Sequence, residues 1–226
     1  MEAGFIAPES VAHARAMQED LRSLVRLEND FPVLKRIAGV DVSYDIKNDM
    51  SRAFIVVMAP RELKPLFDVK AELPTPFPYI PGLLSFREIP VILKALALLP
   101  EPPDLLMVDG QGIAHPRRLG IAAHLGVLTG LPAVGVAKSR LVGEYHEPGL
   151  KKGDSESLMH KGERIGTVLR SKEGTLPLFI SPGHRVDHAT AVALTRASLT
   201  RYRLPEPTRI ADKLSKVKQL QPELEI

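Results

Sequence analysis

The chain contains no cysteine among its 226 residues. This absence excludes disulfide bonds, thiolate nucleophiles and zinc sites built from cysteine. A bound metal ion would therefore need carboxylate, histidine or backbone oxygen ligands. Such ligands favour a hard cation, so we expect Mg²⁺, with Mn²⁺ able to substitute for it.

Long apolar runs, internal repeats and low-complexity segments are also missing. No run approaches the ~20 apolar residues that a membrane-spanning helix needs. The start of the chain, Met1 to Phe5, does not combine a basic segment with an apolar one. We therefore expect no signal peptide, no membrane partner and a cytoplasmic location.

Size and composition fit one large globular domain. The chain is 44% hydrophobic and 25% charged, and we expect a single domain over residues 1–226 that acts as a monomer. The formal net charge of +3 and the pI near 9.1 are compatible with a polyanionic partner. Most mildly basic domains bind no nucleic acid, so this charge alone does not identify one.

The first part of the chain has the pattern of a three-stranded meander. Apolar residues at helical spacing predict a helix over residues 9–28, which Pro32 ends. Alternating or apolar segments joined by short turns then predict antiparallel strands at 36–45, 53–58 and 63–73.

After a proline-rich loop, helices and strands alternate. We expect helices at 85–99, 116–129 (closed by Gly130), 187–199 and 208–220 (with Thr208 as N-cap), strands at 105–108, 133–137, 165–169 and 177–180, and an exposed excursion at 143–163. Helical crossovers connect parallel strands, so the strands at 105–108 and 133–137 should be parallel. The order predicts an α/β fold in which a mixed sheet carries helices on both faces.

Two acids lie where the predicted strands would bring them together. Asp109 ends the apolar strand 105–108 and precedes a glycine turn, and the carboxyl end of a buried strand is where open α/β sheets place their chemistry. Asp41 lies within the first strand, and two close carboxylates are costly to bury unless a cation neutralises them. Glu88, early in the following helix, could complete a three-carboxylate site for metal-assisted phosphodiester hydrolysis.

Simpler explanations of these acids stay open. Asp41 could face solvent, as a single acid in a strand usually does. Glu88 could be a first-turn acid that suits the helix dipole. Asp109 is harder to explain as solvated surface, because an apolar strand precedes it and a Gly-Gln-Gly turn follows it.

Basic side chains near these acids also have two interpretations. Lys138 ends a buried strand, where its ammonium could meet a phosphate or simply extend into solvent. His115 could hydrogen-bond a base or a phosphate, or it could cap the helix predicted to begin at Pro116. Arg117 and Arg118 add positive charge at that helix start, where a phosphate would be favoured.

The loop Phe77-Pro78-Tyr79-Ile80-Pro81-Gly82 is the second informative stretch. Its prolines stiffen the loop, and Tyr79 and Ile80 are apolar residues between them. A stiff apolar tip can act as a wedge between base steps. Alternatively, Tyr79 could turn inward and pack in the core.

At these residues the sequence resembles endonuclease V, the deoxyinosine 3′ endonuclease family. The matching segments run in family order over nearly the whole chain, and the two longest are highly specific. They are Ala38-Gly39-Val40-Asp41-Val42, Pro78-Tyr79-Ile80-Pro81-Gly82-Leu83-Leu84-Ser85-Phe86-Arg87-Glu88, Val108-Asp109-Gly110-Gln111-Gly112-Ile113-Ala114-His115-Pro116-Arg117-Arg118-Leu119-Gly120, Val134-Gly135-Val136-Ala137-Lys138, Gly183-His184-Arg185-Val186 and Tyr202-Arg203-Leu204-Pro205-Glu206-Pro207-Thr208-Arg209.

The resemblance implies a ribonuclease H-like fold, in which a three-strand antiparallel meander is followed by parallel strands. It also implies a Mg²⁺-dependent endonuclease in repair of deaminated bases, which nicks DNA at the second phosphodiester bond 3′ to deoxyinosine and leaves 3′-hydroxyl and 5′-phosphate ends. Inosine in RNA is a second candidate substrate.

Residue roles follow from the same resemblance. It implies catalytic roles for Asp41, Glu88, Asp109 and Lys138, with Asp41 and Asp109 as the metal-binding pair and Glu88 as a third acid. Tyr79 would fill the gap left by a flipped base, and the lesion-binding set is Pro78, Tyr79, Ile80, Gly82, Leu84, Gly110, Gly112, His115 and Gly120.

A late acid is also expected in this fold, and Asp212 stands at about the right place. By pattern, however, Asp212 falls opposite the apolar stripe of its helix (Ile210, Leu214 and Val217), which predicts a solvated side chain.

Two rival functions would account for some of the same residues. A junction resolvase or ribonuclease H would use the acids but has no need of the Tyr79 loop, and a non-catalytic nucleic-acid-binding protein would need only the basic surface.

Overall fold

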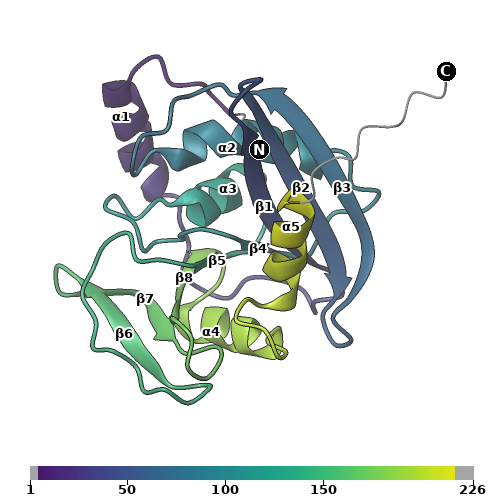
Figure 1. The fold of residues 1–226 in the computed structure, drawn as a ribbon. Helices are drawn as coiled ribbons and strands as arrows, with labels where there is room; N and C mark the ends of the chain where they lie inside the picture. Colours follow the sequence, from purple (N-terminus) through teal and green to yellow (C-terminus); the bar gives the residue numbers. More distant parts are fainter. Residues whose placement is uncertain (1–4, 217–226) are drawn as a thin grey trace.

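The computed structural model describes residues 5–216, and its centre is one continuous sheet (Figure 1). Within these residues the sheet has eight strands in the order β3-β2-β1-β4-β5-β8-β7-β6. The strands are β1 (Ile37–Asp45), β2 (Met50–Ala59), β3 (Lys64–Pro74), β4 (Leu105–Val108), β5 (Ala133–Ala137), β6 (Ser155–His160), β7 (Glu163–Leu169) and β8 (Leu178–His184).

The strand directions agree with the predicted topology. β1, β2 and β3 form the antiparallel meander, and β4 and β5 then add parallel to β1 on its other side. β8 returns antiparallel to β5, and β7 and β6 follow it. This is the ribonuclease H-like order, so the predicted fold class is confirmed.

Helices cover both faces of the sheet (Figure 1). They are α1 (Val11–Arg22), α2 (Leu84–Leu96), α3 (Ile121–Thr129), α4 (His188–Ala197) and α5 (Glu206–Lys216). α2 and α3 pack on one face and α4 and α5 on the other, while α1 lies outside α3. Within residues 5–216, none of the helices is long and apolar enough to cross a membrane.

The apolar run of β4 supplies both layers of the core. Leu106 and Val108 join the cluster beneath α2 and α3, whereas Leu105 and Met107 join the cluster beneath α4. Successive side chains of a strand point to opposite faces, so a strand covered on both sides is apolar throughout. Burial on both faces explains why four consecutive apolar residues precede Asp109.

Two predicted helices are shorter than expected. α1 ends at Arg22, because Ser23 Oγ donates to the Asp20 carbonyl and the following chain bonds elsewhere: the Arg26 carbonyl accepts from the Arg185 amide at 2.7 Å. The helix expected from Pro116 begins only at Ile121. Arg118 has a left-handed φ of 57°, which an α-helix does not allow.

Two further boundaries were wrong. The predicted excursion at 143–163 contains strand β6, which pairs with β7. The last helix begins at Glu206, and Thr208 lies inside it with its hydroxyl on the Pro205 carbonyl. The predicted end of that helix, residues 217–220, and Met1 to Gly4 lie outside the described residues.

Candidate active site

Three carboxylates meet at one edge of the sheet. Asp41 lies on β1, Asp109 directly follows β4, and Asp212 lies on α5. One oxygen from each lies within 4.8 Å of the other two, and all three residues are half-buried. The Asp109 amide donates to the Val40 carbonyl at 3.0 Å, which continues the β1–β4 pairing and fixes the two strand acids side by side.

Asp212 joins this cluster because α5 lies directly on β1. A Cβ at Gly39 would fall 2.0 Å from the Pro207 carbonyl oxygen, so only glycine permits this approach. The face of α5 turned to the sheet carries small or polar residues, with Thr208 and Ala211 fully buried. The prediction of a solvated Asp212 was therefore wrong: its side chain is only 14% exposed.

Lys138 lies between two of these acids. Its Nζ is 2.5 Å from Asp109 Oδ2 and 2.5 Å from Asp212 Oδ1. Burial lowers the pKa of Lys138, but the charges and hydrogen bonds of the two carboxylates outweigh burial and raise it. Lys138 is therefore an ion-paired ammonium within the site and does not simply extend into solvent.

The cluster has the electrostatics of a cation site. Burial, with a contribution from the charges of Asp109 and Asp212, raises the pKa of Asp41 to about 6, while a hydrogen bond from Ser215 and the charge of Lys138 oppose the shift. Two ammonium groups pair with these three carboxylates, that of Lys138 and that of the exposed Lys216, which lies 2.7 Å from Asp212 Oδ2, so negative charge remains unbalanced. All-oxygen carboxylate ligands of this kind suit a hard divalent ion, and these three residues could hold one.

Glu88 lies beside the cluster but is not one of its three members. It is 7% exposed and accepts a hydrogen bond from the Tyr44 hydroxyl at 2.6 Å, and the Arg87 guanidinium lies over the Tyr44 ring. Burial raises the pKa of Glu88 to about 8, and the nearby charges of Asp41 and Asp109 contribute to the shift. Glu88 is thus a buried acid that lies beyond the first turn of α2, so its interpretation as a first-turn acid was wrong.

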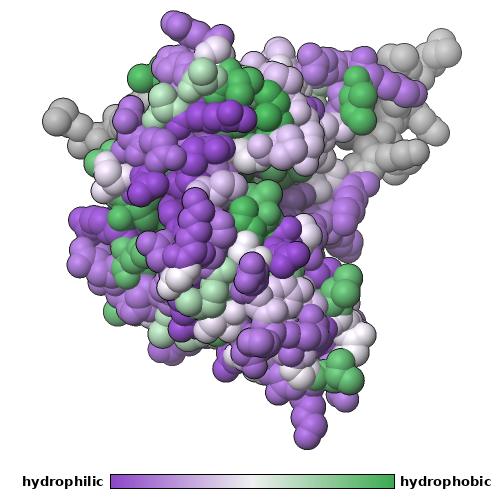
Figure 2. Space-filling view, turned by 90° about the vertical axis from the view of Figure 1, so that its left-hand side faces the viewer, coloured by the Kyte–Doolittle hydropathy of each residue, from purple (hydrophilic) through white to green (hydrophobic). Residues whose placement is uncertain are grey.

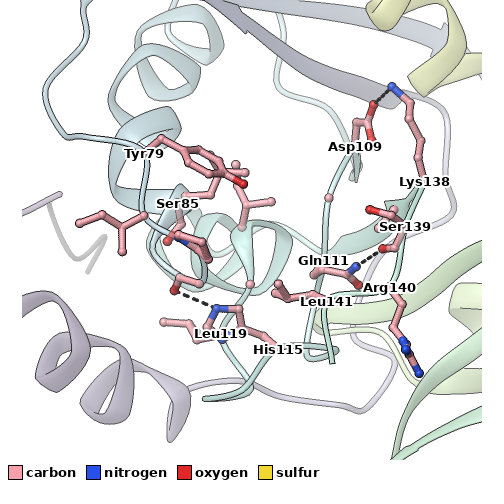
Figure 3. A pocket seen from close by; sticks show the side chains of 18 residues that line it. Tyr79, Ser85, Asp109, Gln111, His115, Leu119, Lys138, Ser139, Arg140 and Leu141 are labelled. Atoms are coloured by element: carbon pink, nitrogen blue, oxygen red, sulfur yellow. Dashed lines mark hydrogen bonds and ion pairs between the residues drawn. The ribbon is translucent and has the colours of Figure 1, made fainter. Parts of the chain in front are cut away.

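A pocket of about 340 Å³ opens next to Asp109 and Lys138 (Figure 3). Ser85, Gln111, Leu119 and residues 139–141 also line it. The predicted lesion-binding residues found in its wall are Tyr79, Ile80, Gly82, Leu84, Gly110, His115 and Gly120.

Two residues of the predicted set do not line this pocket. Pro78 is exposed on the loop before Tyr79. Gly112 lies behind the wall, where its amide donates to Ser181 Oγ at 2.8 Å. The close approach of Gly112 to β8 is therefore a packing contact within the protein.

Tyr79 projects from the pocket rim (Figure 3). It is 67% exposed, so it does not pack in the core. Phe77 does so instead, with its ring centroid 6.1 Å from that of Phe86. The loop closes with a turn from the Leu83 amide to the Ile80 carbonyl, and Gly82 takes a φ of +79° there.

His115 is a neutral part of the pocket wall. Its Nε2 bonds the Gly82 carbonyl at 3.0 Å, and its Nδ1 accepts from the Arg117 amide at 3.2 Å. These partners assign the proton to Nε2 and leave neither nitrogen for a phosphate. Burial, together with the charges of Arg117 and Arg118, lowers the pKa of His115 to about 4, although the hydrogen bond to Gly82 opposes the shift. It thus braces the turn that precedes α3.

Gln111 brings an unpaired acceptor to the same wall. Its Nε2 donates to the Ser139 carbonyl at 2.8 Å, which fixes the orientation of the amide. Its Oε1 is buried and accepts no hydrogen bond from any part of the chain that the structure describes. A buried acceptor left unpaired is costly, so this oxygen is a candidate for ligand contact.

Sequence reasoning missed Tyr44, Ser215 and Gln111 as members of the site. Tyr44 and Ser215 are single polar residues with no motif of their own. Gln111 lies inside the Gly-Gln-Gly turn, where only its partnerless buried oxygen distinguishes it.

The fold and the carboxylate cluster define a nuclease of the ribonuclease H-like class. The profile of the Endonuclease V family matches residues 19–213. The Endonuclease V of Azotobacter vinelandii is 55% identical over 204 residues, which cover 90% of this chain and 92% of that protein. The chain therefore belongs to the Endonuclease V family.

Solved structures agree with this assignment. The crystal structure of Endonuclease V from Streptomyces avermitilis has a TM-score of 0.88 at 45% identity and covers 92% of each chain. Endonuclease V from Ciona intestinalis, in complex with a 23mer DNA containing an inosine followed by a ribo-adenosine, has a TM-score of 0.81 at 30% identity, covering 93% of this chain and 97% of that one.

Proposed function

We propose that this protein is a metal-dependent endonuclease that acts in the repair of deaminated bases. It nicks the strand at the second phosphodiester bond 3′ to deoxyinosine and leaves 3′-hydroxyl and 5′-phosphate ends. The supporting observation is that Asp109 and Lys138 belong both to the carboxylate cluster and to the wall of the adjoining pocket. Asp109 would then take part in cleavage, while Gly110, His115 and Gly120 of the segment that follows it line the base pocket.

Each residue in and beside the carboxylate cluster has a different role in the proposed reaction. Asp41, Asp109 and Asp212 hold Mg²⁺, with Mn²⁺ able to substitute, and the bound ion supplies Lewis-acid activation at the phosphate. Glu88 orders the attacking water from its buried place beside Tyr44. Lys138 exchanges its carboxylate partners for a phosphate oxygen and neutralises negative charge there.

The pocket receives the flipped base, and Tyr79 fills the space that the base leaves in the stack. Hypoxanthine carries an N–H at position N1, where adenine has an acceptor. The buried Oε1 of Gln111 is an acceptor without a partner and can take such a donor. Gly82, Gly110 and Gly120 line the same pocket and would contact the base through their backbone atoms.

Inosine-containing DNA is the proposed partner, as in the Ciona intestinalis complex, and inosine-containing RNA is a second substrate. Hydrophilic side chains dominate the face seen in Figure 2, and hydrophobic ones form only small groups there. The formal net charge of +3 is compatible with salt-dependent phosphate contacts. We further propose that the protein acts as a cytoplasmic monomer.

The test is cleavage of matched DNA and RNA oligonucleotides that carry one inosine or one adenosine, with and without Mg²⁺. We expect a single Mg²⁺-dependent nick beyond the inosine and none in the adenosine controls. Preferential cleavage of branched or hybrid duplexes would instead support a resolvase or ribonuclease H. Binding without any nicking would indicate a non-catalytic protein.

A further inference from the structure

The carbonyl of Gly82 is the anchor of the Tyr79 loop. Three side chains converge on this oxygen: His115 Nε2 at 3.0 Å, Arg117 Nη2 at 2.9 Å and Gln18 Nε2 at 3.1 Å. A Cβ at Gly82 would meet Arg117 Nη2 at 3.2 Å, so the donors leave little room. Gly82 is three residues from Tyr79, and its carbonyl fixes where the loop rejoins the pocket wall.

Gln18 is the one of these three that comes from a distant part of the chain. It lies on α1, is only 1% exposed, and stands 64 residues before Gly82. Its Oε1 accepts from Arg117 Nε at 2.6 Å, and its Nε2 also approaches the carbonyl of Leu119, a pocket residue, at 3.4 Å. A single amide therefore connects the loop, the arginine that holds the loop, and the pocket wall.

A packing role alone does not account for a glutamine at this position. The buried neighbours in this region are apolar: Ala14 and the half-buried Met17 pack with Phe77, Leu83 and Phe86. A buried amide is favourable only when its donors and acceptor are paired. Here the partners are the Gly82 carbonyl of the loop, the Leu119 carbonyl of the pocket wall, and Arg117, which itself holds Gly82.

We propose that Gln18 is a positioning residue that sets the Tyr79 loop relative to the base pocket, an inference that rests on the proposed function. Without the Gln18 amide, Arg117 Nε loses its acceptor and the Gly82 carbonyl loses one of three donors, so the loop must be ordered by the substrate at the cost of binding free energy. The carboxylate cluster lies on β1, β4 and α5, whereas α1 packs on α3. The effect should therefore fall on substrate binding and base discrimination, and the chemical step should be spared.

The test uses the full chain with Gln18→Leu, which removes all three hydrogen bonds, and Gln18→Glu, which keeps the acceptor for Arg117 but removes the amide donor. Asp20→Asn, on the exposed side of the same helix, is the matched control. We expect KM for inosine-containing DNA to rise about tenfold in Gln18→Leu and less in Gln18→Glu. We expect kcat and the half-saturating Mg²⁺ concentration to stay within about twofold, and Asp20→Asn to match the wild type.

A double-mutant cycle with Tyr79→Ala tests whether Gln18 acts through the loop. If it does, Gln18→Leu should add little to the KM of Tyr79→Ala. Fully additive effects, an unchanged KM in folded Gln18→Leu, or a loss of kcat in proportion to the folded fraction would each overturn the inference. If Gln18→Leu does not fold, Gln18→Glu supplies the same comparison.

These results are separable from failure of the proposed function. A wild-type protein that does not nick inosine-containing DNA contradicts the proposed function itself. A wild-type protein that nicks it, with Gln18 variants that nick it equally well at low substrate concentration, contradicts only the role of Gln18.

Discussion

The ammonium of Lys138 lies 2.5 Å from a carboxylate oxygen of Asp212, although the two residues are 74 positions apart in the chain. The same ammonium lies 2.5 Å from Asp109. α5 thus closes the site by supplying a third carboxylate to the pair that β1 and β4 bring together. A metal ion and Lys138 would compete for the same oxygens.

Asp212→Asn should therefore weaken metal-dependent activity. The amide keeps the size of the side chain but removes one of three anionic ligands. We expect the rate of nicking at low Mg²⁺ to fall at least about 100-fold, the equivalent of ~3 kcal/mol, with part of it recovered at high Mg²⁺. A Mg²⁺ titration of activity measures this, with Lys213→Gln on the exposed side of α5 as control. Equal titration curves would remove Asp212 from the site.

Tyr79→Ala should weaken binding to the lesion much more than binding to the metal. Stacking of an aromatic ring on a base contributes about 1–3 kcal/mol, so we expect the Kd for inosine-containing duplex to rise about tenfold or more. The measurement is fluorescence anisotropy with inosine-containing and undamaged duplexes, and Leu66→Ala, on the exposed edge strand β3, is the control. If Tyr79→Ala leaves the preference for inosine intact, Tyr79 is not the wedge.

Gln111→Met should reduce discrimination between inosine and adenosine. Methionine has a similar length but offers no strong acceptor to an N1–H donor. We expect the ratio of kcat/KM for the two bases to fall about tenfold, mainly through slower cleavage at inosine. Parallel kinetics on the two substrates give this ratio. An unchanged ratio would mean that the backbone alone selects the base.

Stability without metal should pass through a maximum near pH 6.5. The folded-state pKa of Asp41 is raised to about 6 and that of Glu88 to about 8. The folded protein therefore binds protons that the unfolded chain has released, and stability falls as pH rises toward 8. The buried His115, His124 and His184 have pKa values lowered to about 4, so they act in the opposite sense and reduce stability as pH falls below about 6.5. Below about pH 6 these three histidines outweigh the two acids, which places the maximum near pH 6.5.

Melting temperatures from pH 5 to 8.5, with and without Mg²⁺, test this balance. Mg²⁺ should raise Tm more at pH 8 than at pH 5, because Asp41, whose pKa is raised to about 6, is charged at pH 8 and largely protonated at pH 5. Glu88→Gln should flatten the alkaline side of the curve and steepen the acidic side, because the raised pKa of Glu88 makes stability fall with pH over the whole interval from about 4.5 to 8. A Tm that rises steadily from pH 6.5 to 8.5 in the absence of metal would contradict the assignment.

Local sequence patterns predicted the meander, the parallel strands and the meeting of Asp41 with Asp109. These features follow from the periodicity of single strands and from the rules for crossover connections. Both can be recognised within short segments of the sequence. Asp212 was misplaced because its helix packs through the small residues Thr208 and Ala211, and a hydrophobic stripe does not reveal such a face. The Gly39–Pro207 contact that permits this packing joins segments far apart in the chain.

The start of α3 and the roles of two glutamines also depend on contacts between segments far apart in the chain. The late start of α3 follows from the left-handed Arg118, whose side chain is held by Glu163 and His160 on the β6–β7 hairpin. Gln18 and Gln111 acquire their roles from partners on other elements. No pattern within their own segments distinguishes these glutamines from surface ones.

The most direct test of the account is cleavage and binding by Asp109→Asn, because Asp109 belongs both to the metal cluster and to the pocket wall. Single-turnover nicking and anisotropy binding would be measured on the same inosine-containing duplex in Mg²⁺. We predict that nicking is abolished while the affinity for the inosine duplex stays within about threefold of the wild-type value. Near-normal Mg²⁺-dependent nicking by this variant would contradict the account.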